Sequence, residues 1–85
     1  MSGEAMLKDA AKVVAQRAKA YGPPARSMEL LARRWSVTLG RTVTPAQAVM
    51  CLIDLKLTRL AHDPKHQDSI LDIAGYAAVL HELSQ

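Results

Sequence analysis

The 85-residue sequence contains few cysteine and aromatic residues, which stabilise many small domains or form their functional sites. It has one cysteine, no phenylalanine, two tyrosines and one tryptophan. A single cysteine, Cys51, excludes an internal disulfide and any zinc module that needs several cysteines. No apolar run approaches the ~20 residues that span a bilayer. The first residues, MSGEAMLKDAAKVV, lack the unbroken apolar block of a secretory signal. These absences predict a cytoplasmic protein with no membrane partner.

The remaining composition is that of an ordinary folded domain. Hydrophobic residues make up 49% and charged residues 22% of the chain, with a formal net charge of +3, which argues against intrinsic disorder. A chain this short cannot build two cores, so we expect one domain over residues 1–85. With few aromatic residues, the core must come from aliphatic side chains and alanine, which bury little area each. We therefore expect a homodimer or higher oligomer that hides further apolar surface.

Proline and glycine divide the sequence into four segments whose apolar residues recur at helical spacing. The predicted helices cover residues 4–20, 25–39, 45–60 and 68–83. Thr44-Pro45-Ala46-Gln47 predicts an N-cap with a capping box, and Asp68 or Ser69 is the expected cap of the last helix. The third helix is apolar almost all round, so we expect it to be central and most buried, with Cys51 inside. The prediction is an all-α, compact four-helix domain in which helices three and four form an antiparallel hairpin.

Charge is divided unevenly along the chain. Residues 1–41 contain eight basic and three acidic residues, whereas residues 42–85 contain three basic and five acidic residues. Arg26, Arg33, Arg34 and Arg41 are therefore candidates for contact with an acidic protein or with nucleic acid. A solvated face is the simpler interpretation. Nucleic acid is disfavoured as a partner because the third helix is too apolar to lie in a DNA groove.

A second polar group lies on the third and fourth helices. Lys56 and Arg59 share one helix edge, while Asp68, Asp72 and Tyr76 follow one another at intervals of four residues. An antiparallel hairpin would bring the cations opposite the aspartates. Charge on a buried helix must be paired or liganded. The two interpretations are structural salt bridges, or a phosphate or nucleotide site in which the cations bind phosphate, the aspartates orient them and Tyr76 contacts the ligand.

Other conspicuous residues favour structural roles. Gly75 inside a helix costs about 1 kcal/mol relative to alanine, which indicates close approach of a neighbouring helix more than of a ligand. Tyr76 is also typical of a core residue with an anchored hydroxyl group. His62 and His66 are separated by Pro64 and lack the further ligands of a zinc site, so we predict no metal site there.

The runs Lys56-Leu57-Thr58-Arg59-Leu60 and Asp68-Ser69-Ile70-Leu71-Asp72-Ile73-Ala74-Gly75-Tyr76-Ala77 can be compared with known families. Together with Tyr21-Gly22-x-Pro24 and Trp35, they resemble a family of small phage and prophage proteins of unknown function, over about residues 17–83. That family is more distantly similar to the MazG-like all-α nucleotide pyrophosphohydrolases. Those enzymes hold magnesium on a Glu-x-x-Glu and a Glu-x-x-Asp motif, and the metal activates water against a nucleoside triphosphate.

The sequence departs from those metal motifs. Lys56-x-x-Arg59 stands in place of the first, and Ser69-x-x-Asp72, with Asp68 beside it, in place of the second. Two carboxylates are too few to hold Mg²⁺, and two cations would repel it. The resemblance implies a catalytically inactive phage accessory protein of the host cytoplasm, without a cofactor, that binds a nucleotide or phosphate through Lys56 and Arg59. The alternatives are a protein-binding factor that inhibits a host or defence protein through its basic helices, and a residual pyrophosphohydrolase.

Overall fold

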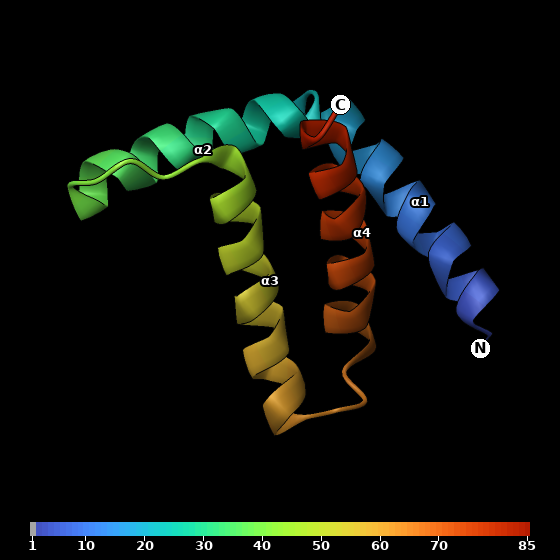
Figure 1. Ribbon diagram of the computed structural model, residues 1–85. Coiled ribbons are helices and arrows are strands. Elements are labelled where there is room, and N and C mark those ends of the chain that lie inside the picture. The colour runs from blue at the N-terminus through green and yellow to red at the C-terminus, as the bar shows by residue number, and fades with distance from the viewer. Residues whose placement is uncertain (1) are drawn as a thin grey trace.

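Four α-helices account for nearly all of the chain in the computed structural model, which describes residues 2–85 (Figure 1). They are α1 (Gly3–Tyr21), α2 (Pro24–Leu39), α3 (Pro45–His62) and α4 (Gln67–Leu83). The described residues contain no strand. The predicted all-α, four-helix fold is confirmed, and its helix limits differ from the observed ones by two residues at most. None of the helices in this range is both long and apolar enough to cross a membrane.

Local sequence signals account for most helix ends. The Thr44 Oγ1 accepts a hydrogen bond of 3.1 Å from the Gln47 N–H, and the Gln47 side chain accepts one of 2.9 Å from the Thr44 N–H. This confirms the predicted capping box of α3. Gly22, with φ of 87°, ends α1 and donates its N–H to the Ala18 carbonyl. The cap of α4 differs from the prediction, because His66 and not Asp68 or Ser69 occupies the N-cap position.

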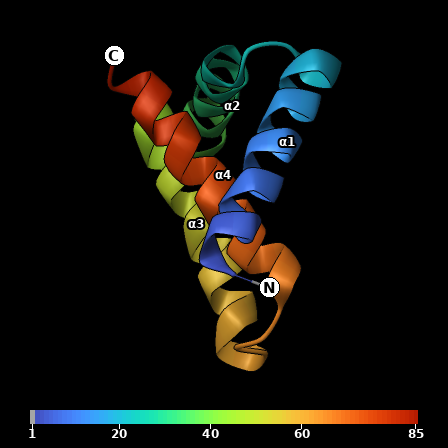
Figure 2. The ribbon, with the colours of Figure 1, turned by 90° about the vertical axis from the view of Figure 1, so that its right-hand side faces the viewer.

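The helix at the centre of the arrangement is α4, not α3. The two form the predicted antiparallel hairpin, and Figure 2 shows α1 lying along the other side of α4. The helix α2 crosses one end of this layer and extends beyond α3 (Figure 1). The prediction that α3 is the most buried helix is therefore wrong. Its outer side chains Met50 and Leu57 are 49% and 50% exposed, since no other helix covers that side.

The core is small because alanine supplies much of it. The buried apolar residues are Ala10, Ala32, Ala48, Val49 and Val79, and the largest fully buried side chains are those of Val49 and Ser69. Among residues 2–85, eight large apolar residues are exposed, namely Leu7, Tyr21, Leu30, Val37, Leu39, Met50, Leu55 and Leu57. Small side chains let the helices approach closely but remove little apolar area from water. Much of the apolar surface of the chain therefore remains accessible.

Gly75 lies where α4 faces α1, as its position inside a helix predicted. A Cβ atom at this position would lie 3.6 Å from Cγ2 of Val14, which is an ordinary van der Waals contact. The helix α1 therefore lies close to α4 at this position, but it leaves enough space for an alanine.

We expect Gly75→Ala to stabilise the protein by about 1 kcal/mol, because helix propensity improves and the new methyl group fits. The matched control is Ala78→Gly on the exposed part of the same helix, which should destabilise it by about the same amount. Urea unfolding followed by circular dichroism measures both. If Gly75→Ala were less stable than the parent, the conclusion that a Cβ atom fits beside Val14 would be wrong.

Candidate functional site

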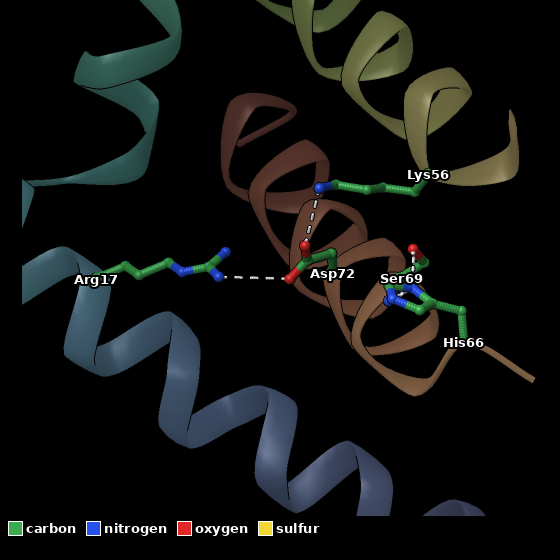
Figure 3. Close-up of polar contacts among 5 residues, drawn as sticks. All are labelled: Arg17, Lys56, His66, Ser69 and Asp72. Atoms are coloured by element: carbon green, nitrogen blue, oxygen red, sulfur yellow. Dashed lines mark hydrogen bonds and ion pairs between the residues drawn. The ribbon is translucent and has the colours of Figure 1, made fainter. Parts of the chain in front are cut away.

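Two cations, one from α1 and one from α3, meet at the carboxylate of Asp72 on α4 (Figure 3). Asp72 lies on α4 with its side chain 7% exposed. Its Oδ2 is 3.0 Å from Nζ of Lys56 on α3, whose side chain is 11% exposed. Its Oδ1 is 3.4 Å from Nη2 of Arg17 on α1. The carboxylate therefore links α4 to the helices on both of its sides, and the predicted contact between Lys56 and Asp72 is confirmed.

The two cations of this cluster differ in exposure. Lys56 is buried, so its ammonium group depends on Asp72 to offset the cost of leaving water. The Arg17 side chain is 53% exposed and reaches Asp72 through one of its guanidinium nitrogens. Arginine has five N–H donors, so Arg17 keeps donors for a further acceptor. With two cations on one carboxylate, the cluster carries a formal charge of +1.

A cavity of about 170 Å³ lies between α1, the start of α2 and α4, next to this cluster. Its walls are mainly apolar and include Val13, Val14, Met28, Leu71 and Val79, while Arg17, Tyr21, Ser27, Asp72 and Tyr76 supply polar groups. An apolar cavity of about 150 Å³ holds a benzene molecule. The space is thus large enough for one planar ring, with a positive charge at its edge.

Three of the five predicted ligand-binding residues belong to this region. Lys56 and Asp72 form the ion pair, and Tyr76 lines the cavity together with Asp72. Arg59 and Asp68 do not join them: both are exposed, and neither forms an ion pair with any residue from 2 to 85. The expected ion pairing of these two is therefore wrong.

Helix geometry explains why Arg59 and Asp68 lie elsewhere. Arg59 is three residues after Lys56, which turns it about 60° around α3, away from the direction of Asp72. Asp68 is in the first turn of α4 and lines a shallow hollow with Met6 and Asp9 near the start of α1. Neither residue lines the cavity beside Asp72.

Arg17 is the member of the cluster that the sequence prediction did not include. In the sequence it is one of several basic residues of α1, for which a solvated role is the simplest interpretation. The available signal was its spacing of three and four residues from Val14 and Val13, which face α4. Only the placement of α1 against α4 reveals its contact with Asp72.

His66 forms a second buried polar contact, at the start of α4 (Figure 3). Its Nδ1 accepts a hydrogen bond of 3.3 Å from the Ser69 N–H and lies 2.7 Å from the Ser69 Oγ. Since the N–H can only donate, Nδ1 carries no proton, and the Ser69 hydroxyl donates to it as well. Ser69 is 1% exposed, so this contact satisfies a buried hydroxyl and no substrate can reach it.

The remaining candidates are on the surface. Arg26 forms an exposed ion pair of 3.2 Å with Glu29, while Arg33, Arg34 and Arg41 are exposed. Cys51 is also exposed, which corrects the prediction that it is buried in α3. Over residues 2–85, the histidine, cysteine and carboxylate side chains form no group of three or more that could hold a metal ion.

We expect Asp72→Ala to destabilise the protein by about 3–5 kcal/mol, because it leaves Lys56 buried without a counter-ion. Arg17→Gln should cost less than about 1 kcal/mol, since that ion pair is half exposed. The double variant Lys56→Met/Asp72→Leu should recover most of the lost stability. Urea unfolding of the three variants provides the comparison. Equal stability of Asp72→Ala and the parent would show that Lys56 does not depend on this carboxylate.

We expect His66→Ala to lower the free energy of unfolding by about 2–3 kcal/mol, through loss of the helix cap and of the acceptor for the Ser69 hydroxyl. His66→Asp keeps an acceptor at the cap and should retain most of the stability. His62→Ala, at an exposed position, is the matched control and should change stability by less than about 0.5 kcal/mol. Thermal unfolding measures all three, and a neutral His66→Ala would refute the role of this contact.

Comparison with known proteins relates the chain to phage proteins. It is 38% identical over 69 residues to the Gene 55 protein of Mycobacterium phage L5, covering 80% of this chain and 44% of that protein. It is 27% identical over 81 residues to the Gene 55 protein of Mycobacterium phage D29, covering 94% of this chain and 54% of that protein. The chain thus spans about half the length of these relatives.

No solved structure matches the chain significantly. A family model described as a domain of unknown function, DUF6378, matches residues 5–84. The predicted resemblance to phage proteins of unknown function is thereby confirmed. The chain belongs to the DUF6378 family.

Proposed function

We propose that this domain is the ligand-binding part of a phage accessory protein, and that it binds a nucleotide or a related phosphorylated ligand without hydrolysing it. The observation that carries the proposal is the cluster of Lys56, Asp72 and Arg17 beside the cavity that Tyr76 lines. Lys56 neutralises Asp72 from the α3 side, so the charge of Arg17 remains available to an anion. A planar ring in the cavity would place an attached phosphate near this charge.

The proposal assigns the phosphate contact to Arg17 in place of Lys56 and Arg59. Lys56 is buried and already paired, while Arg59 does not line the cavity. Arg17 offers a planar fork of donors that suits phosphate, and Asp72 orients it. Tyr76 contacts the ring of the ligand. Tyr21, 78% exposed at the cavity edge, can stack on the ring from the solvent side.

The lining of the cavity supports binding without hydrolysis. Asp72 is the one carboxylate among its lining residues, and two cations already hold it. Magnesium needs several oxygen ligands and is disfavoured by neighbouring positive charge. In this proposal the domain is a MazG-like fold without its metal ligands. Its support is the α3–α4 hairpin, which pairs Lys56 and Asp72 at the positions of the two lost motifs.

A thermal-shift series with AMP, ATP and inorganic phosphate, each with and without Mg²⁺, tests the proposal. A ligand at about ten times its Kd adds ~1.4 kcal/mol to the free energy of unfolding, which is a rise in Tm of about 5–10 °C for a domain of this size. We expect a rise with a nucleotide, independent of Mg²⁺. Arg17→Gln should abolish it, and Arg59→Gln is the matched control that should preserve it. No rise with any of these compounds, or a rise unchanged in Arg17→Gln, would refute the site.

We further expect no release of pyrophosphate from ATP or other nucleoside triphosphates at high protein concentration with Mg²⁺. Measurable turnover that Asp72→Asn abolishes would overturn the assignment of an inactive protein.

The outer face of α2 favours a second candidate, the binding of an acidic host or defence protein. Leu30 and Val37, 46% and 84% exposed, lie with Arg33 and Arg34 around a shallow hollow on this helix. Exposed apolar side chains between arginines are typical of a protein interface. The double variant Arg33→Glu/Arg34→Glu should lose a partner captured from host lysate, whereas Lys12→Glu on α1 should retain it. Equal capture by both variants would exclude this face.

A further inference from the structure

The C-terminal half of α2 has a core-facing side with no core beneath it. Leu39 follows Ala32 by seven residues and Trp35 by four, so the three side chains share one face of the helix. Ala32 is 2% exposed, whereas Leu39 is 63% exposed. The difference arises because α2 extends beyond α3, as Figure 1 shows. The face that packs on the bundle at one end is therefore largely open at the other, where the loop residues Thr42 and Val43 border it.

A hollow of about 400 Å³ lies in the angle between this part of α2 and the outer side of α3. Trp35 and Leu39 line it from α2, and Met50 and Cys51 line it from α3. Met50 is 49% exposed and Cys51 is exposed. Two helices thus present apolar side chains toward one concave space, which we call the α2–α3 hollow.

We infer that a second copy of this chain fills the α2–α3 hollow and that the protein is a two-fold symmetric dimer through this surface. The accessible area of the chain supports this. It is 6035 Å², whereas a compact monomer of this mass exposes about 5,000 Å². The whole chain thus exposes about 1,000 Å² more than such a monomer, which is of the order of the ~800 Å² that each partner buries in a standard interface.

The charges around the hollow also fit a second copy. Arg41 lines the hollow, and Asp54 lies one helical turn after Met50 on the same outer side of α3. Both are exposed, and neither forms an ion pair with another described residue. A two-fold interface pairs a surface with itself, so it needs both signs of charge. An acidic foreign protein would instead favour the basic outer face of α2.

Sedimentation equilibrium of the whole chain at about 10–100 µM tests this inference, which is independent of the proposed ligand site. We expect a mass of twice the 9.3 kDa of one chain. Leu39→Glu and Met50→Glu should yield monomers, because each places a charge in the apolar interface. Leu7→Glu on α1 and Val37→Glu on the opposite side of α2 are matched controls at exposed positions and should remain dimers. Circular dichroism confirms that each variant is folded.

The single cysteine provides a second measurement. The rate at which a maleimide modifies Cys51 should fall as the concentration of the parent protein rises, and should be independent of concentration in Met50→Glu. A monomeric parent at 100 µM would overturn the inference. So would a dimer that persists in Leu39→Glu and Met50→Glu but dissociates in Leu7→Glu or Val37→Glu, because another face would then form the interface.

Discussion

The buried carboxylate of Asp72 is the interaction on which the arrangement of the helices depends. Lys56 from α3 and Arg17 from α1 approach it from opposite sides of α4. A buried ammonium group is costly unless a counter-ion accompanies it, so α3 and α4 can pack closely only in the register that joins Lys56 to Asp72. The same contact leaves Arg17 at the edge of the cavity with an unneutralised charge. The register of the bundle and the chemistry proposed for the cavity thus have one origin.

The second constraint is the scarcity of large buried side chains. With alanine and valine as its buried apolar residues, the interior gains little free energy per residue from burial. Specific polar contacts therefore contribute more to fixing the arrangement of the helices than they would in a protein with an aromatic core. Lys56–Asp72 fixes the middle of the α3–α4 hairpin, and His66–Ser69 fixes its turn. Both contacts satisfy groups that would otherwise be buried without partners.

Sequence reasoning succeeded where the signal is local. The capping box at Thr44, the division of the chain by proline and glycine, and the period of the apolar residues require only neighbours in the chain, and all three were confirmed. The Lys56–Asp72 contact was also predictable, since a short loop forces the hairpin that joins them. Arg17 could not be found in this way, because its partner is 55 residues distant and depends on how α1 packs against α4. The cap by His66 was missed because histidine is not among the residues preferred there.

The predictions of burial that failed share one location. Cys51 and the outer side of α3 were expected inside, and both border the α2–α3 hollow, as does the exposed Leu39. An amphipathic pattern records which side chains avoid water in the working protein, and it does not distinguish burial within one chain from burial between chains. Errors of the same sign at one surface therefore indicate a missing neighbour more than unrelated failures. The apolar residues that the single chain leaves exposed at this surface are those that a second copy would cover.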